Sequence, residues 1–389
     1  MKRILFLQSI IRSEDFGGLT HQIELIRNLS AHMEVYFLPE GTEKAQKAEP
    51  GRKDLLFISS HGSKAGTIFK HTMNILFKGF TALKRYHIQA IYVRHGISTI
   101  PAIFLGKVSR LPVIVEMNGI LADEVSIAGG WSGWRYPLIL LDRLACRYST
   151  GIIAVTGGLE NYVVEYFGRN EDDIAVIPNG ANTHVFKPMN MTQCKTKLGL
   201  DTGSRYIGFV GNLSAWQGVE YLIEAMTFIR KKMPDVKLLV IGSGVMANRL
   251  EDLARSLQVG DIIQFTGAMD YEKIPEYVNA CNVCAAPFVR ARNERIGLSP
   301  LKVYEYAACG RPQVASNICS LSFLEERKMG LLVEPESSQL LAGAIMQILS
   351  DRERAERMGA RGREYIEKEH SWEVIAHRIS DACTKFLDR

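Results

Sequence analysis

The sequence alternates short apolar runs with amphipathic segments, and it goes through this alternation twice. In the first half the apolar runs predict strands, and segments 20–30, 136–148 and 159–167 between them have helical periodicity. The expected strands lie at 3–8, 34–38, 55–59, 90–93, 113–116, 151–155 and 174–177. Strands that are apolar along their length and alternate with helices are typical of a parallel sheet covered on both faces. We therefore expect an α/β fold that is doubly wound.

The alternation pauses at a polar stretch after residue 186 and then starts again. Further strands are expected at 206–210, 237–241, 262–265, 283–286, 313–315 and 330–333, and helices at 219–233, 246–257 and 274–280. The tail, 337–389, has helical periodicity throughout. Because 389 residues are too many for one core, the pattern predicts two Rossmann-like domains, 1–186 and 205–370, with a linker at 187–204 and a ligand cleft between them.

Charge and cysteine content narrow the class of protein. The net charge of +5 is only mildly basic, and we expect no nucleic-acid partner. Seven unevenly spaced cysteines do not suggest a disulfide framework, and Cys281 and Cys284 are better explained as buried thiols than as a zinc or redox pair. The short apolar N-terminus fits a buried first strand better than a signal peptide, and no apolar run reaches membrane-spanning length. We expect a cytoplasmic protein.

The basic residues are unevenly distributed. Between Asp54 and Glu116 there is no acidic residue, and within that stretch residues 64–87 place apolar side chains among lysines and arginines. This composition resembles a basic amphipathic helix that lies on an anionic membrane surface, which would make the protein peripheral to the membrane. The alternative is a core-facing helix with a solvated basic back.

A short helix is predicted after Ser299-Pro300 and is ended by Gly310 and Pro312. The Ser-Pro pair offers a cap, and the free N–H groups of the first turn suit an anion. Lys302 lies in that turn, with Glu305 one turn later on the same face. A cation for phosphate and a carboxylate for sugar hydroxyls would suit a nucleotide-sugar; the alternative is a capped helix with both side chains in solvent.

Two further segments of the first half end or follow predicted strands. Gly17 and Gly18 follow the first strand, where glycines allow close approach of a diphosphate or simply form a turn. Glu116 and Asn118 bracket another strand end and could orient sugar hydroxyls, although an Asn-Gly turn explains them equally well. His21 has no evident partner in the sequence and is interpreted as a capping or packing residue.

Glycine-rich turns also follow strands in the second half. Residues 211–218 open a helix in a way that suits phosphates. Residues 242–247 match the dinucleotide pattern G-x-G-x-x-A, but the next predicted strand does not end in the acidic residue that pattern requires, so we predict a tight turn. The sequence contains no DxD carboxylate pair, which disfavours a sugar transferase dependent on that metal site, and we expect no metal or other cofactor.

Together these segments resemble the retaining glycosyltransferases of family 4 (group 1), which have the two-Rossmann GT-B fold. The resemblance covers essentially the whole chain and is carried by residues 17–19, 177–180 with 186–188, 208–213 with 218–225, 304–312 and 370–373. It implies that the second domain binds a UDP- or GDP-sugar and the first binds a saccharide or lipid-linked saccharide acceptor. It also implies that the last helix, 371–389, crosses back to pack on the first domain.

The resemblance further implies roles for individual residues. Glu305 would bind the ribose, Gly297, Leu298 and Ser299 would face the phosphates, and Gly267 and Met269 would lie near the base. Asn118 stands where many relatives have a histidine that contacts the transferred sugar. The remaining expected contacts are Gly17, Gly18, Asn212 and Gln217 with the donor, and Glu116 and Glu124 with the acceptor.

The chain departs from the family pattern at three places. Asn212 and Gln217 occupy positions where relatives have Arg and Lys, and Gly297 replaces a glutamate for which Glu294 is the nearest substitute. A departing diphosphate still needs positive charge, so Lys302 is our first candidate. We expect a retaining hexosyltransferase of cell-envelope glycan synthesis; the alternatives are a nucleotide-sugar 2-epimerase and a non-catalytic sugar-nucleotide-binding subunit.

Overall fold

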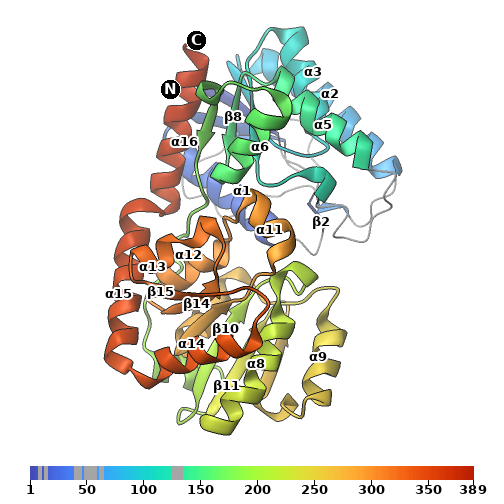
Figure 1. Ribbon diagram of the computed structural model, residues 1–389. Helices are drawn as coiled ribbons and strands as arrows, with labels where there is room; N and C mark the ends of the chain where they lie inside the picture. The colour runs from blue at the N-terminus through green and yellow to red at the C-terminus, as the bar shows by residue number, and fades with distance from the viewer. Residues whose placement is uncertain (8–10, 13–15, 39–45, 48–58, 61–64, 124–134) are drawn as a thin grey trace. The chain divides into compact units, whose positions relative to one another are not determined.

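The computed structural model describes the chain except for residues 8–10, 13–15, 39–45, 48–58, 61–64 and 124–134 (Figure 1). The chain divides into two compact units. Unit 1 consists of Met1–Pro178 with Trp372–Arg389, and unit 2 consists of Asn179–Ser371. Each is an α/β unit built on its own sheet, as the alternating pattern predicts.

Unit 1 contains a seven-stranded sheet in the order β4-β3-β1-β6-β7-β8-β9. Its strands are β1 (Arg3–Leu7), β3 (Glu34–Phe37), β4 (Gln46–Lys47), β6 (Ala90–Arg94), β7 (Val113–Met117), β8 (Gly151–Ala154) and β9 (Ile174–Val176). All neighbours pair in parallel except β4, which is antiparallel to β3 at the edge. A separate parallel pair is formed by β2 (Ile11–Arg12) and β5 (Ser59–Ser60). Most of the strand expected at 55–59 lies outside the described residues.

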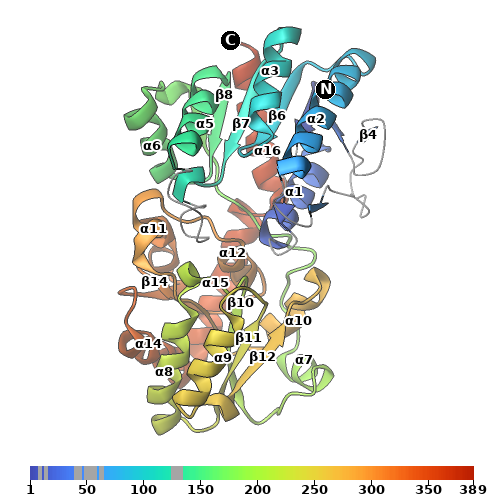
Figure 2. The ribbon, with the colours of Figure 1, turned by 90° about the vertical axis from the view of Figure 1, so that its right-hand side faces the viewer.

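Helices cover both faces of this sheet. One face carries α1 (Phe16–Leu29) and α16 (Trp372–Leu387); the other carries α2 (Ala65–Arg85), α3 (Thr99–Ser109), α5 (Arg135–Tyr148) and α6 (Gly157–Phe167) (Figure 2). Helix α16 packs on α1 and β8, with Trp372 edge-on to His21. Because both faces are covered, β7 and β8 are buried along their whole length.

Unit 2 contains a six-stranded parallel sheet in the order β12-β11-β10-β13-β14-β15. Its strands are β10 (Arg205–Val210), β11 (Val236–Ile241), β12 (Ile263–Gly267), β13 (Val283–Ala286), β14 (Gln313–Ser316) and β15 (Gly330–Val333). Its helices are α7 (Met191–Lys197), α8 (Val219–Lys232), α9 (Ala247–Ser256), α10 (Ile274–Ala280), α11 (Arg290–Ile296), α12 (Leu301–Ala308), α13 (Phe323–Glu326), α14 (Ser338–Ser350) and α15 (Arg352–Glu369).

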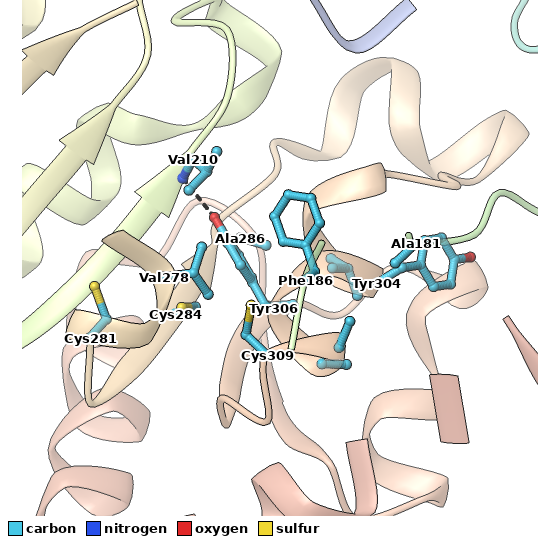
Figure 3. Packing of buried hydrophobic residues seen from close by; sticks show 14 of the residues in the cluster. Ala181, Phe186, Val210, Val278, Cys281, Cys284, Ala286, Tyr304, Tyr306 and Cys309 are labelled. Atoms are coloured by element: carbon cyan, nitrogen blue, oxygen red, sulfur yellow. Dashed lines mark hydrogen bonds between the residues drawn. The ribbon is translucent and has the colours of Figure 1, made fainter. Parts of the chain in front are cut away.

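Two hydrophobic clusters lie on opposite faces of the unit 2 sheet. Alternate residues of β10 divide between them, since Tyr206 and Val210 belong to one and Ile207 and Phe209 to the other. Figure 3 shows the first cluster, in which the Tyr306 hydroxyl accepts a 2.6 Å hydrogen bond from the Val210 amide. Cys281 and Cys284 are buried in this cluster, as the sequence predicts, and burial raises the pKa of Cys284.

The segment 187–204 differs from the expected linker. It contains α7, whose Cys194 and Lys195 are buried, and it contacts α10. Polar residues on the outward side of α7 hide its periodicity in the sequence, while Cys194 and Leu200 join the first cluster of unit 2. The passage from unit 1 to unit 2 lies at Pro178–Asn179, before this segment.

Candidate functional site

The loop after β10 is fixed to its neighbours in unit 2. It contains a 3-10 turn (Ala215–Gln217) and reaches α8 through Gly218, whose φ is +64° and whose absent Cβ would lie 1.9 Å from the Pro287 carbonyl oxygen. Leu213 donates to Ser243 at 2.9 Å and accepts from Met246 at 2.9 Å. The loops after β10 and β11 are therefore joined by backbone hydrogen bonds. Residues 242–247 form the tight turn predicted there.

Lys302 is the buried cation of this region. Its side chain leaves the first turn of α12 and reaches the loop after β10, where Nζ donates to Gln217 Oε1 at 2.6 Å. It lies 3.8 Å from the Phe209 ring centroid, and the Cβ that Gly211 lacks would stand 2.8 Å from it. The structure thus brings Lys302 and Gln217, two of the predicted site residues, into direct contact.

Burial dominates the electrostatics of Lys302. It is 7% exposed, and desolvation lowers its pKa well below the ordinary value of 10.5, although nearby Glu305 acts to raise it. An ammonium has three N–H donors, and within the described residues Gln217 provides the single hydrogen-bond acceptor for Lys302. An anion placed against this amine would supply the missing acceptors and restore its charge.

The predicted phosphate-facing loop is anchored at both of its ends. Gly297 ends α11 with φ +71°, and Leu298 N donates to Ser320 Oγ at 2.6 Å. Ser299 Oγ accepts from the Asn179 backbone amide at 2.7 Å, and the Ser299 carbonyl accepts from the Asn179 side chain at 2.5 Å. Ser299 therefore does not cap α12 as the sequence suggested; the N-cap position is Pro300, without a side-chain hydrogen bond.

Asn179 and His370 contact each other in unit 2, and this pair is called the clasp below. His370 Nδ1 lies 3.3 Å from the Asn179 carbonyl oxygen, and the His370 carbonyl accepts from the Ala181 amide at 2.9 Å. The His370 ring stacks on Tyr304 of α12 at 5.0 Å between centroids. The residues beside both chain passages between the units are thus bonded to each other and, through Ser299, to the phosphate-facing loop.

The other predicted residues of unit 2 lie in different surroundings. Glu305 is buried on α12, Gly267 ends β12 with φ +72°, and Met269 is half-buried against the first cluster. Asn212 lies against Gly244, where an added Cβ would meet its Oδ1 at 2.5 Å. Glu294 differs from these, because it is exposed on α11 and pairs with Arg290 at 3.0 Å.

In unit 1, Glu116 is the centre of a buried polar cluster at the end of β7. It is 1% exposed. Its Oε2 accepts from the Tyr92 hydroxyl at 2.6 Å, and its Oε1 lies 2.6 Å from both Asn118 Nδ2 and His21 Nε2. Glu116 therefore holds Asn118 and His21 in place instead of presenting its carboxylate to an acceptor as the sequence suggested.

The charge of Glu116 fixes the orientation of Asn118. Burial would raise the Glu116 pKa, but His21, Arg94 and the Tyr92 hydroxyl together outweigh burial and lower that pKa to about 2. A carboxylate only accepts hydrogen bonds, so the Asn118 amide nitrogen must face it. The half-buried Asn118 then has its amide oxygen directed away from Glu116, as an acceptor for a hydroxyl group.

Gly17 and Gly18 lie in the first turn of α1, not in a loop before it. The Gly18 carbonyl accepts from Arg94 Nη1 at 2.8 Å, which connects the start of α1 to the end of β6 and to the Glu116 cluster. Glu124, the other expected acceptor contact, lies outside the described residues.

Sequence reasoning missed the partners of Glu116 and of the phosphate-facing loop. His21 and Tyr92 are far from Glu116 in sequence, and Ser320 and Asn179 are far from 297–299. One signal was present: an acidic residue at the end of an apolar strand needs cations or donors when it is buried. Among the described residues, no three His, Cys, Asp or Glu side chains group as a metal site would require.

The two halves of the chain match different family models. Residues 190–365 match the family described as Glycosyl transferases group 1, and residues 17–185 match Glycosyltransferase Family 4. The GDP-mannose-dependent alpha-(1-6)-phosphatidylinositol monomannoside mannosyltransferase of Mycobacterium tuberculosis is 28% identical over 325 residues, which are 81% of this chain and 82% of that protein. The D-inositol 3-phosphate glycosyltransferase of Segniliparus rotundus is 27% identical over 59% of this chain and 50% of its own.

Solved structures share the fold. Sucrose-phosphate synthase from Thermosynechococcus elongatus superposes with a TM-score of 0.77 at 21% identity, covering 98% of each chain. Anabaena HepE in complex with UDP and glucose superposes with a TM-score of 0.75 at 18% identity, covering 99% of this chain and 100% of its own. None of the helices that can be described is both long and apolar enough to cross a membrane.

Proposed function

Because the chain belongs to the group 1, family 4 glycosyltransferases and has their GT-B fold, we propose that it moves a hexosyl unit from a UDP- or GDP-sugar to a saccharide or lipid-linked saccharide, with retention at the anomeric carbon. It is a glycosyltransferase that uses a nucleotide sugar. The choice of donor nucleotide, the acceptor and the stereochemical outcome are our proposal.

The observation that carries the donor side of the proposal is the buried amine of Lys302. It lies between the glycine-rich loop after β10 and the first turn of α12, with hydrogen-bonding capacity that Gln217 does not fill. A nucleoside diphosphate has the charge and the acceptor oxygens that this amine lacks. Glu305, one turn later on α12, would accept from the ribose hydroxyls, and 297–299 would provide backbone N–H groups to the phosphates.

The proposed reaction needs no protein nucleophile. The acceptor hydroxyl oxygen bonds to the anomeric carbon on the face from which the diphosphate departs, while the bond from that carbon to the phosphate oxygen breaks. The hydroxyl proton passes to a departing phosphate oxygen. Lys302 would stabilise the charge that develops on the diphosphate, which is the usual source of the largest catalytic effect. Products are the glycosylated acceptor and the nucleoside diphosphate.

The acceptor side of the proposal rests on unit 1. The amide oxygen of Asn118, fixed by ionised Glu116, suits a hydroxyl of the transferred sugar or the acceptor. The Mycobacterium tuberculosis relative is named for GDP-mannose and a phosphatidylinositol mannoside, which supports GDP-mannose and a lipid-linked acceptor as first candidates. We place the enzyme in the cytoplasm, at the inner face of the membrane, because all seven cysteines are free thiols and α2 has the basic amphipathic composition noted above.

Two measurements test this function. A panel of UDP- and GDP-sugars is screened for a rise in melting temperature, because a ligand that binds the native state stabilises it. The stabilising donor is then incubated with phosphatidylinositol mannoside or a soluble disaccharide, with and without EDTA, and nucleoside diphosphate is measured. We expect release that depends on acceptor and is insensitive to EDTA. Acceptor-independent conversion would instead indicate an epimerase, and stabilisation without turnover with any acceptor would indicate a binding subunit.

A further inference from the structure

Unit 2 has a hollow between α13, the start of β15 and one side of α15 (Figure 1). Its volume is about 340 Å³, which is in the size range of small-molecule sites. It lies toward the amino ends of the parallel strands, whereas the loop after β10 that Lys302 reaches lies at their carboxyl ends. The hollow, called the arginine hollow below, is lined by Glu325, Lys328, Gly330, Leu331, Arg354, Arg357, Met358 and Arg361.

Four of the eight residues that line the arginine hollow are basic, and one is acidic. Arg354, Arg357 and Arg361 come from α15, where positions three and seven residues apart share a face of the helix. With the rise of an α-helix these three positions span about 10 Å along the helix axis. Lys328 joins them from the turn after α13. The hollow is therefore lined by a row of cations.

The ion pairs of α15 leave two of these cations without a carboxylate. Outside the hollow, Arg352 and Lys368 pair with glutamates one turn away, at 2.8 and 2.6 Å. Arg357, which lines the hollow, also pairs with a glutamate, at 3.4 Å. In the part of the chain that the structure describes, neither Arg354 nor Arg361 forms an ion pair. The two uncompensated guanidinium groups of the helix thus lie at the same hollow.

The acid of the arginine hollow does not cancel this charge. Glu325 Oε1 accepts a hydrogen bond from the Leu332 amide at 3.0 Å, which joins α13 to β15. One carboxylate against four cations leaves a net charge of +3 on the lining residues. Each guanidinium has five N–H donors and no acceptor, so a molecule that enters the hollow meets many donors and a positive potential. We therefore expect a ligand with several negative charges.

The walls of the arginine hollow are held in place by the packing of unit 2. The Cβ that Gly359 lacks would lie 2.0 Å from the Gly310 carbonyl oxygen, so α15 packs directly against the end of α12. Phe323 of α13 stacks on Tyr365 of α15 at 5.8 Å between ring centroids. The two helices that line the hollow are therefore fixed to each other without a ligand, which lowers the entropy cost of binding one.

We propose that the arginine hollow binds a polyphosphate, which is a chain of phosphate groups that is either inorganic or carried by a nucleoside. Guanidinium groups bind phosphate oxygens through paired, charge-assisted hydrogen bonds. A row of three guanidinium groups over about 10 Å suits successive phosphates of a chain better than a single phosphate. The volume of the hollow suits a compact ligand. This binding is separate from the proposed function, because none of the residues assigned to the donor or the acceptor lines the hollow.

Calorimetric titration of the full chain with tripolyphosphate, ATP, orthophosphate and citrate tests the proposal. It is carried out on the wild type and on Lys302→Met, because the proposed donor site would also accept phosphates. In both proteins tripolyphosphate should bind the hollow at least tenfold more tightly than orthophosphate or citrate, and more weakly as salt is raised. Tighter binding of ATP than of tripolyphosphate would assign the ligand to nucleotides, and equal binding to the phosphate chain alone. Absence of tripolyphosphate binding to Lys302→Met, or equal binding of citrate, would overturn the proposal.

A pair of matched variants locates the binding. Arg354→Gln, Arg361→Gln removes the two cations without ion pairs and should weaken tripolyphosphate binding at least tenfold. Its control, Arg352→Gln, Lys368→Gln, makes the same change in net charge on the same helix but outside the hollow, and should bind within about twofold of the wild type. Melting temperature and release of nucleoside diphosphate should be unchanged in both. Equal weakening by the two variants would overturn a defined site, whereas absence of turnover in the wild type would contradict only the proposed function.

Discussion

Glu116 in unit 1 and Lys302 in unit 2 are both buried charges beside the end of a strand, but their surroundings differ. Glu116 has contacts to both oxygens from Tyr92, Asn118 and His21, and its pKa is lowered to about 2, so that it remains ionised. Lys302 has one hydrogen-bond acceptor among the described residues and two aromatic neighbours. Burial lowers its pKa, which favours the neutral amine.

Glu116 is therefore stabilised by residues of its own unit, whereas Lys302 lacks comparable stabilisation of its charge. The interactions around Glu116 are complete without a ligand, so its removal should affect stability and the position of Asn118. The desolvation of Lys302 is not compensated in the unit as described, so its removal should affect ligand binding and turnover more than folding. The following substitutions test the distinction, in order of decreasing expected effect.

Lys302→Met should cause the largest loss of activity. Lys302 is the buried cation proposed to contact the diphosphate. Its removal should lower kcat/KM at least 100-fold, which corresponds to a loss of about 3 kcal/mol of transition-state stabilisation. The melting temperature should stay the same or rise, because an isosteric apolar side chain replaces an uncompensated charge. Steady-state release of nucleoside diphosphate measures kcat/KM, and thermal unfolding measures the melting temperature. Near wild-type turnover would exclude Lys302 from the site.

Lys195→Met is the matched control for this substitution. Lys195, on α7, is another buried lysine of unit 2, and it lies in a segment that contributes no predicted site residue. Unlike Lys302, its Nζ donates to a backbone carbonyl, that of Ser204, at 2.7 Å. Turnover should be unchanged and stability lower, which is the reverse of the result expected for Lys302→Met.

The pH dependence of stability should also identify Lys302. Because its pKa is lowered on folding, the folded chain binds fewer protons than the unfolded chain between that lowered pKa and 10.5. The free energy of unfolding contributed by this group therefore rises with pH across that window. Subtracting the profile of Lys302→Met from that of the wild type should give this rise. In contrast, UDP or GDP binding, which favours the ammonium form, should weaken as pH rises in the wild type alone.

Glu116→Gln should have the largest effect on stability. Lowering the carboxyl pKa from 4.5 to about 2 corresponds to about 3 kcal/mol of native-state stability at neutral pH. Because the folded pKa is lowered, this contribution is present above pH 4.5 and is lost as the pH falls toward 2. Urea unfolding at pH 7 and pH 3 should therefore show a large difference between wild type and variant at pH 7 and a smaller one at pH 3. A constant difference would contradict the pairing.

Asn118→Asp should cause a smaller, pH-dependent loss of activity. A second carboxylate would then face Glu116, and the repulsion would turn the new side chain away or raise its pKa. We expect about a tenfold decrease in kcat/KM at pH 8, partly recovered at pH 6 where a shared proton can bridge the two groups. Asn118→Ala should lose activity without such recovery. Identical pH profiles for the two variants would show that Glu116 does not orient Asn118.

Glu294→Gln should have the smallest effect. Glu294 is exposed and pairs with Arg290, an arrangement that contributes at most about 1 kcal/mol. Turnover within about threefold of wild type would show that no catalytic carboxylate is needed at this position; a loss comparable to that of Lys302→Met would restore the role that its sequence position suggested.

The sequence was informative where the structure depends on local pattern. Continuous apolar runs predict strands buried on both faces, and Gly310 and Pro312 end α12 as expected, with Gly310 at φ +68°. The edge strand β4 and the helix α7 were not predictable, since two residues give no periodicity and α7 has a largely polar outer surface. Lys302 and Glu305 could be proposed from their place in one turn of helix.

The contacts that give those residues their character depend on tertiary structure. Nothing near Lys302 in the sequence indicates that it reaches Gln217, because the two are brought together by the order of β10 and β13 in the sheet. Likewise, His21 meets Glu116 only because α1 and β7 belong to one layered unit. Sequence periodicity specifies which face of an element is buried, but it does not specify which distant side chain is there.

The clasp of Asn179 and His370 has a mechanical consequence. The chain passes between the units at 178–179 and again at 371–372, and the residues beside these passages are bonded to each other. The unit 2 ends of both passages therefore belong to one hydrogen-bonded group. Asn179 also holds Ser299, so the same group anchors the loop that would hold the phosphates. A substitution at Asn179 would therefore loosen that loop and the unit 2 ends of both passages together.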